Sequence, residues 1–263
     1  MKTVSIINLK GGAAKTITAA NMAHILATVH GKRVLLVDND KQGNISKMFG
    51  LHNYEDFTIA DVLTGRAAFL GELIAPSQYK RLDIIPANMN LLSAIKEVIL
   101  DSLRPHQTRL KTALKQLSAG EYDYCIIDNA PDINVSTVNA LVASHEVIIP
   151  IKIDKFAFDG LAELLEQIYT TKDALNEGLT VRGCLVTSYQ RNEVNIQGEA
   201  VLRSRDDLTV FQTLIRRTEK VDESTFAAMP ILEYSPRCGA AKDYLAFVNE
   251  YLNVSESDTK REA

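Results

Sequence analysis

The sequence lacks the features that mark several common classes of protein. Its three cysteines, Cys125, Cys184 and Cys238, are odd in number and lie far apart without C-x-x-C spacing, which argues against a disulfide framework and a zinc ribbon. No run of 18 apolar residues occurs, so no membrane-spanning helix is predicted. The chain has no excess of basic charge either, because 29 Lys and Arg stand against 33 Asp and Glu, for a net charge of -4. Any contact with nucleic acid must therefore come from a local patch.

The composition is that of a globular protein. The chain has 263 residues, 46% hydrophobic and 24% charged, and contains no low-complexity segment that would mark a linker. We therefore expect a single domain over residues 1–252 and a polar, frayed C-terminal tail at 253–263. The chain enters an apolar run at once and shows no charged leader with a cleavage site. These features predict a soluble, cytoplasmic protein.

Short apolar runs alternate with longer segments of helical periodicity along most of the chain. Continuous hydrophobicity at residues 34–37 and 125–127 indicates strands that are buried on both faces. The alternation predicts an α/β fold, a mostly parallel twisted sheet with helices on both faces. The runs expected to form strands are residues 4–8, 33–37, 82–86, 124–128, 146–150 and 182–187.

A loop suited to phosphate follows the first expected strand. Residues 8–16 read N-L-K-G-G-A-A-K-T and lead into a helical stretch of small residues. The N–H groups of such a loop and helix N-terminus bind phosphate oxygens, while Lys15 would reach the β- and γ-phosphates and the Thr16 hydroxyl would bind Mg²⁺. The strict pattern G-x-x-x-x-G-K-[ST] is not met, because Leu9 and Ala14 occupy its glycine positions. On this segment alone, a tight glycine turn without a ligand stays an open interpretation.

Two further expected strands end in acidic residues. Residues 37–44 read V-D-N-D-K-Q-G-N and put Asp38 and Asp40 at the carboxyl end of the second strand. Residues 125–131 read C-I-I-D-N-A-P and bring Asp128 to the same edge, as a Walker B aspartate does for Mg²⁺. Because ligands of open α/β sheets bind at this edge, the sequence predicts a nucleotide site like that of the P-loop NTPases.

Together these motifs resemble those of the ParA/MinD family of deviant Walker A ATPases. K-G-G-A-A-K-T at residues 10–16 is similar to the family's K-G-G-x-x-K-[ST], and V-D-N-D-K-Q-G-N is similar to its V-D-x-D-x-Q-G-N. Y-D-Y-C-I-I-D-N-A-P at residues 122–131 resembles the family's Y-D-Y-x-x-x-D-x-x-P. The resemblance covers nearly the whole chain and is greatest to the ParA/Soj-type DNA partition ATPases.

The resemblance implies an ATPase that uses ATP and Mg²⁺, and it assigns roles by position. Lys15 would bind phosphate, Asp40 would position the attacking water, and Lys10 would cross into the partner's nucleotide site in an ATP-sandwiched homodimer. Thr16 and Asp128 would form the Mg²⁺ side, Asp128 directly or through water. Asp38 is a further candidate metal ligand. The residues that would contact the nucleotide are Lys10, Gly11, Gly12, Ala13, Ala14, Lys15, Thr16 and Ile17.

Two residues depart from the family pattern. Ala14 stands where glycine is usual, so the loop would be strained if that position needs a positive φ. Ile17 stands where many members have a threonine, which removes one side-chain contact to the α-phosphate. Both changes would weaken ATP binding or turnover.

A modest basic window lies in the C-terminal third of the chain. Residues 182–220 contain seven Lys and Arg against five Asp and Glu, or +2, which leaves -6 for the rest. Arg191, Arg217 and Lys220 lie in segments that resemble the DNA-contacting stretches of partition proteins. An ordinary solvated surface with salt bridges stays an open alternative for this window.

The predicted function is that of a ParA-type ATPase that dimerises around ATP, binds DNA nonspecifically on the nucleoid and segregates a plasmid, mobile element or chromosome. A ParB-like, centromere-binding partner protein would stimulate an otherwise slow hydrolysis. Two alternatives stay open, namely a positioning ATPase for a non-DNA cargo and a nucleotide-dependent binding module with negligible hydrolysis. No membrane contact is expected, because the polar C-terminal residues do not form a basic amphipathic pattern.

Overall fold

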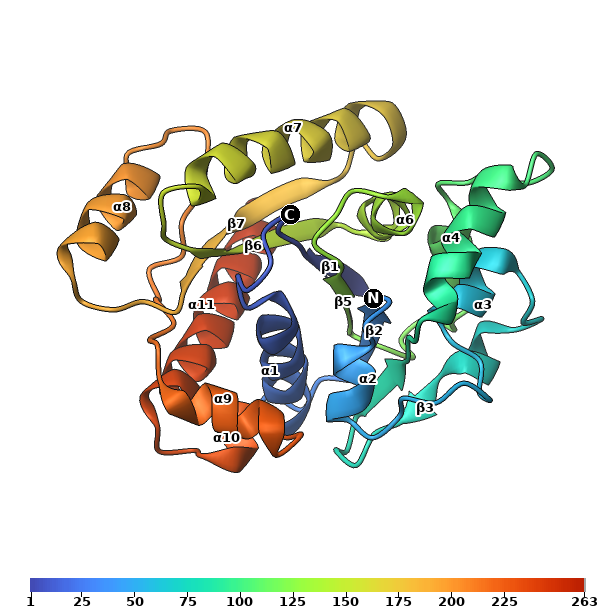
Figure 1. Ribbon diagram of the computed structural model, residues 1–263, viewed down its shortest axis with the longest axis horizontal. Helices are drawn as coiled ribbons and strands as arrows, with labels where there is room; N and C mark the ends of the chain where they lie inside the picture. The colour runs from blue at the N-terminus through green and yellow to red at the C-terminus, as the bar shows by residue number, and fades with distance from the viewer. Residues whose placement is uncertain (263) are drawn as a thin grey trace.

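The computed structural model describes the backbone of residues 1–262 and the side chains of residues 1–253. Its centre is a seven-stranded sheet with the strand order β3-β4-β2-β5-β1-β6-β7 (Figure 1). β3 pairs with β4 in antiparallel orientation, and all other neighbouring strands are parallel. The strands are β1 (Lys2–Ile6), β2 (Val34–Asn39), β3 (Ala75–Pro76), β4 (Leu82–Ile85), β5 (Tyr124–Asn129), β6 (Glu146–Lys152) and β7 (Thr180–Thr187).

Helices connect the strands and cover the sheet on both faces (Figure 1). They are α1 (Lys15–Thr28), α2 (Asn44–Met48), α3 (Ile59–Thr64), α4 (Asn90–Leu100), α5 (Arg109–Leu114), α6 (Val135–Ala143), α7 (Ala157–Leu175), α8 (Glu193–Arg203), α9 (Glu219–Phe226), α10 (Ile231–Tyr234) and α11 (Gly239–Glu262), with a short 3₁₀ turn, η1 (Leu70–Leu73). No helix among the described residues is long and apolar enough to cross a membrane.

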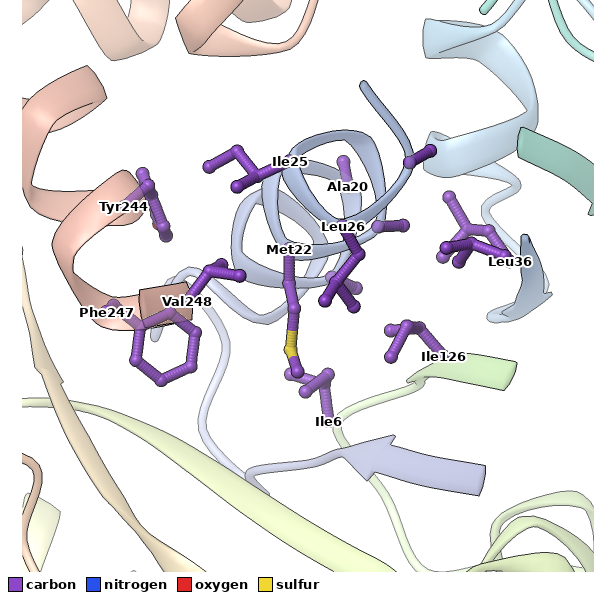
Figure 2. Close-up of a cluster of buried hydrophobic side chains, with 14 of the residues drawn as sticks. Ile6, Ala20, Met22, Ile25, Leu26, Leu36, Ile126, Tyr244, Phe247 and Val248 are labelled. Carbon is purple, nitrogen blue, oxygen red and sulfur yellow. The ribbon is translucent and has the colours of Figure 1, made fainter. Parts of the chain in front are cut away.

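The alternation of side chains along the central strands explains the two covered faces. Ile6, Leu36 and Ile126 belong to the apolar cluster that contains α1 and α11 (Figure 2). Their neighbours Leu35 and Ile127 belong to a cluster on the other face, with residues of α3, α4, α5 and α6. Since successive residues of a strand point to opposite faces, a run that is apolar throughout can fill both layers.

All six predicted strands are present, with ends that differ from the prediction by no more than two residues. The α/β fold class is therefore confirmed. The sequence did not predict β3, which has only two residues and ends in Pro76 at the edge of the sheet, where a missing N–H is tolerated. That the chain forms a single domain over residues 1–252 stays a prediction.

The backbone of α11 is helical to Glu262, and the expectation of a polar, frayed tail over residues 253–263 stays a prediction. Residues 253–262 contain no glycine or proline, and a polar composition alone does not break the i→i−4 hydrogen bonds of a helix. The side chains from residue 254 onward, and the whole of residue 263, lie outside the described part of the chain.

The order of the strands determines where a ligand can bind. β1 lies between β5 and β6. From β1 the chain first passes to β2, which lies on the β5 side, and it forms β6 on the other side only later. The carboxyl ends of β1, β2, β5 and β6 thus bring four loops together at one edge. A crevice at such a reversal of strand order is where ligands of open α/β sheets bind.

Candidate nucleotide site at the carboxyl edge of the sheet

The loop between β1 and α1 is held in place by hydrogen bonds to β6 and β7. The Asn8 amide donates a hydrogen bond to the Pro150 carbonyl at 2.7 Å, and its side-chain oxygen accepts one from the Lys10 N–H at 2.9 Å. The Thr187 hydroxyl donates to the Ala13 carbonyl at 3.1 Å. These bonds to β6 and β7 hold both ends of the loop.

Ala14 occupies the left-handed region that favours glycine. Its φ is 63° and its ψ is 30°, where an L-residue with a Cβ is strained. The position therefore does require the positive φ at which alanine strains the loop. Ala14 is also the N-cap of α1 and offers no side chain to its first turn. The N–H groups there need partners, and a phosphate would supply them.

Lys15 is a buried cation within this loop. The residue is only 7% exposed, and its ammonium donates a hydrogen bond to the Lys10 carbonyl at 3.2 Å. Burial lowers the pKa of Lys15, and the carboxylates of Asp128, Asp40 and Asp132 oppose this effect. The structure therefore brings the predicted lysine together with acids from two other loops.

Asp128 is a buried acid whose oxygens lack well-formed hydrogen bonds. The residue is 1% exposed, and neither carboxylate oxygen has a partner of good geometry among the described residues. Burial raises its pKa well above the usual range, and so does nearby Asp38. Weaker interactions with the Thr16 hydroxyl and the Lys15 ammonium oppose this rise. Such a group is costly to leave without a partner, which a cation would provide.

Asp38 lies beside Asp128 in the register of β2 and β5 but has a different environment. One carboxylate oxygen accepts hydrogen bonds from the Ser46 N–H at 2.9 Å and the Ser46 hydroxyl at 2.7 Å, and the other accepts from the Asp40 N–H at 3.3 Å. Burial still raises the pKa of Asp38 to about 6. Its contacts favour a role in holding the loop before α2, although a metal-binding role for Asp38 stays a prediction.

Asp40 begins a tight turn after β2. One oxygen of its carboxylate accepts from the Gln42 N–H at 2.9 Å, and its carbonyl accepts from the Gly43 N–H at 2.9 Å. Gly43 has a φ of +62°, and a Cβ there would lie 2.6 Å from the Ala87 carbonyl oxygen. The glycine of the V-D-N-D-K-Q-G-N motif is thus required both by conformation and by space.

A buried amide network joins the strands that carry these acids. Asn39 donates to the Asn129 side chain at 2.9 Å and to the Ser136 carbonyl at 3.2 Å, and the Ser136 hydroxyl donates to Asn39 in return. Asn129 donates to the Ile6 carbonyl of β1 at 3.2 Å. This network was not predicted from the sequence, although each asparagine directly follows a site aspartate.

Lys10 is paired within its own chain. Its ammonium forms an ion pair with Asp154, which follows β6 and also accepts from the Phe156 N–H at 3.0 Å. Lys10 lowers the pKa of Asp154. Asp154 was not predicted from the sequence, although it follows an apolar strand at the same edge, as Asp40 and Asp128 do.

The basic window contains fewer free charges than its sequence suggests. The loops that carry Arg191 and Arg217 lie side by side, because the Arg217 N–H donates to the Tyr189 carbonyl at 2.9 Å. Neither arginine has an ion pair among the described residues, and both are exposed. The paired cations are Arg203 with Glu199, Arg205 with Asp207, Arg216 with Asp243 and Lys220 with Glu223.

The donor set suits a magnesium ion held together with a phosphate. Asp128 and Thr16 supply hard oxygens, and the buried Asp128 carboxylate, without a well-formed hydrogen bond among the described residues, is the structural sign that a cation belongs there. The described residues contain no cluster of three or more His, Cys, Asp or Glu that could hold a metal alone. This agrees with Mg²⁺, which commonly binds through one or two protein oxygens plus phosphate and water.

Known proteins share both the sequence and the fold. A family model described as an AAA domain matches residues 1–181. The chromosome partitioning protein ParA of Caulobacter vibrioides is 34% identical over 256 residues, which are 96% of this chain and 94% of that protein. The sporulation initiation inhibitor protein Soj of Bacillus subtilis is 35% identical over 251 residues, or 95% and 97% of the two chains. The crystal structure of a Mycobacterium smegmatis cobyrinic acid a,c-diamide synthase, with an ATP analogue and magnesium, matches with a TM-score of 0.85 at 28% identity and covers 98% of this chain and 96% of that one.

The strain at Ala14 leads to a prediction about stability. Ala14→Gly should raise the free energy of unfolding by up to about 1 kcal/mol, because the cost of a Cβ in the left-handed region exceeds the entropy that glycine adds to the unfolded chain. Urea denaturation measures this. The matched control is Ala13→Gly, since Ala13 is buried and has no positive φ, and this change should destabilise. Equal destabilisation by both changes would contradict the strain.

Proposed function

The chain belongs to the ParA/MinD family of P-loop ATPases, and we propose that it binds ATP with Mg²⁺ at the carboxyl edge of its sheet and hydrolyses ATP in the partition of a DNA molecule. The observation that carries this proposal is the buried carboxylate of Asp128, which lacks a well-formed hydrogen bond among the described residues and lies beside Lys15 and the open N-terminus of α1. The similarity to ParA and Soj supports the cellular role.

Each site residue has a role that its contacts support. Lys15 would neutralise phosphate oxygens, and its burial strengthens that attraction because few waters screen it. Thr16 and Asp128, the latter directly or through water, would hold Mg²⁺, which supplies charge neutralisation on the phosphates. Asp40 has one oxygen tied to Gln42, and the other is available to orient a water. The loop over residues 10–17 would surround the phosphates.

Two alternatives use the same site. A cargo other than DNA would need the same nucleotide chemistry, and a binding module with negligible hydrolysis would follow if the strain at Ala14 and the apolar side chain of Ile17 impaired turnover. The synthase whose structure matches this fold is less similar in sequence, at 28% identity, than the partition proteins at 34% and 35%. A partition role is therefore favoured over that synthase activity.

The role of Asp40 can be tested by separating binding from chemistry. Asp40→Ala should keep ATP affinity within about twofold of the parent and reduce turnover by at least about 100-fold, the scale for loss of a general-base or water-positioning group. Calorimetry with ATP and a phosphate-release assay give the two numbers. Asp173→Ala, an exposed acid on α7, serves as the control and should change neither. Parallel loss of ATP affinity would instead assign Asp40 to the metal site or to the fold.

Dimerisation around ATP would require Lys10 to leave Asp154. A residue that acts on the partner's nucleotide contributes nothing to binding by a monomer, so Lys10→Ala should leave ADP affinity unchanged within about twofold and abolish the ATP-dependent dimer. Light scattering with ATP and with ADP measures this. A normal ATP-dependent dimer in the variant would refute the role of Lys10 in trans.

DNA binding would depend on two copies of a small patch. A monomer with a net charge of -4, in which Arg191 and Arg217 have no ion pair among the described residues, can neutralise few phosphates, whereas a dimer presents both arginines twice. Lys220 is less available, because both oxygens of Glu223 accept hydrogen bonds from its ammonium. Binding would ignore DNA sequence and weaken steeply with salt, and a ParB-like partner would end it by stimulating hydrolysis.

The patch is tested by reversing one charge. Arg191→Glu should weaken ATP-dependent binding to an unrelated duplex by about tenfold or more while the dimer persists. The control is Lys115→Glu, an exposed lysine after α5 and away from the window. Mobility shifts with ATP, with ADP and without nucleotide provide the measurement. Unchanged binding by Arg191→Glu, or no ATP-dependent binding by the parent at low salt, would favour the DNA-independent alternatives.

A further inference from the structure

A pocket of about 350 Å³ lies at the amino-terminal edge of the sheet, away from the nucleotide site. Thr3, near the start of β1, and His145, directly before β6, line it together with Lys111 of α5 and residues that precede β5 and β7. These four strands are parallel, so their amino ends lie at one edge of the sheet and the phosphate loop lies at the other. A pocket of this size is at the lower end of the range for small-molecule sites.

The charged side chains that line this pocket all have the same sign. They are Lys111 and Lys115, which are one helical turn apart, and no Asp or Glu is among the lining residues. Lys111 is half-buried and Lys115 is exposed, and neither ammonium forms an ion pair or a hydrogen bond with the described residues. The pocket therefore attracts an anion, and none of its side chains has a charge that would repel one.

His145 adds a hydrogen-bond donor in a defined tautomer. Its Nδ1 accepts a hydrogen bond from the Thr3 N–H at 3.0 Å, so the proton of the neutral ring is on Nε2. Burial lowers the pKa of His145, and positive charges near the ring, Lys2 and Lys111 among them, lower it further. Glu146 opposes this effect. The neutral ring thus has one N–H for a ligand, in positively charged surroundings.

The Thr3 hydroxyl is a buried polar group without a partner. The residue is 2% exposed, and its hydroxyl forms no hydrogen bond with the part of the chain that the structure describes. The hydroxyl of Ser144, which also lines the pocket, is by contrast bonded to the Ser5 hydroxyl at 2.9 Å and to the Ala140 carbonyl at 2.7 Å. A buried hydroxyl is costly unless it is hydrogen-bonded, and a ligand in the pocket would supply the partner that Thr3 lacks.

Much of the remaining wall is apolar, and it is formed by Leu114, Leu117, Val142 and Ala143. A phosphate or sulfate ion alone would leave these side chains in contact with water, whereas an organic body would remove them from water. The lining thus combines hydrogen-bond donors for an anionic group with an apolar surface for the rest of a ligand.

We propose that this pocket is a second ligand site, which binds a small organic carboxylate with an apolar or aromatic body. The carboxylate would accept hydrogen bonds from donors among Lys111, the His145 Nε2–H and the Thr3 hydroxyl, and the body would cover the apolar wall. The exposed Lys115 adds only to the local charge. Because the pocket and the phosphate loop are at opposite ends of β1, the inference does not depend on the proposed nucleotide site.

The test uses benzoate and naphthoate as carboxylates of two sizes, with benzamide and naphthamide as neutral probes of the same shapes. Titrations followed by the backbone amide resonances of the ¹⁵N-labelled protein give the affinity and the location of binding. At least one carboxylate should cause saturable shifts of amides that line the pocket, such as those of Thr3, Leu117 and Gly178. Its carboxamide and inorganic sulfate should each bind at least about tenfold more weakly, since one lacks the charge and the other the apolar body.

Substitutions then assign the donors. Lys111→Met keeps an unbranched stem and should weaken carboxylate binding by about tenfold, while carboxamide binding stays within about twofold. Lys96→Met is the matched control, because Lys96 is an exposed lysine on α4 that does not line the pocket, and it should change neither affinity.

Thr3→Val tests the buried hydroxyl with a side chain of the same shape. It should weaken carboxylate binding by about fivefold without lowering the free energy of unfolding of the ligand-free protein, because the lost hydroxyl has no partner there. Urea denaturation measures the second quantity.

Four results would overturn the proposal. They are the absence of shifts at the lining amides with both carboxylates, equal affinity for a carboxylate and its carboxamide, sulfate binding as tight as that of the carboxylates, and equal losses in Lys111→Met and Lys96→Met. Unchanged carboxylate affinity in Thr3→Val would remove Thr3 from the site. Since ADP does not enter these titrations, none of the outcomes bears on the nucleotide site.

Discussion

Opposite charges are buried close together at one edge of the sheet, and the rest of the site depends on how they are compensated. Lys15 and Asp128 are both buried. Burial lowers the pKa of Lys15 and raises the pKa of Asp128, so it favours the neutral form of each. A structure keeps such groups only where something else compensates them. The loop N–H groups, Lys15 and the buried Asp128 carboxylate are together suited to a ligand that is itself anionic and metal-bound.

Neighbouring acids at this edge have different hydrogen-bond partners and therefore different roles. Asp38 and Asp128 are paired in register on adjacent strands, yet the Ser46 N–H and hydroxyl occupy Asp38 and leave Asp128 without a good partner. The same principle distinguishes the cations. Lys10 and Arg216 are held by single acids, Asp154 and Asp243, and so occupy defined positions beside the loop. Partners, more than residue type, determine what each charge can do.

Local patterns were enough to predict the fold class and that Asp38 and Asp128 would lie close together at one edge of the sheet. The runs that became β1, β2 and β5 are apolar throughout, and parallel strands with acids at their carboxyl ends can only bring those acids to one edge. The motif showed only that Ala14 would be strained if its position required a positive φ, and the structure shows that φ.

Tertiary partners could not be predicted in this way. Asp154 lies 144 residues from Lys10, and Asp243 lies 27 residues from Arg216 on a different element. Which acid reaches which cation depends on how helices pack, and no periodicity in the sequence records that. The short edge strand β3 was missed for a related reason, since two residues carry no detectable pattern.

The central claim is that the buried Asp128 carboxylate binds a cation. Its most direct test is the effect of Mg²⁺ on nucleotide affinity in Asp128→Asn. Calorimetry with ADP, in the presence of Mg²⁺ and in its absence, gives the enhancement due to the metal. The parent should bind more tightly with Mg²⁺, and Asp128→Asn should keep its metal-free affinity but lose at least about tenfold, or about 1.4 kcal/mol, of the enhancement. An enhancement of the same size in parent and variant would contradict the account.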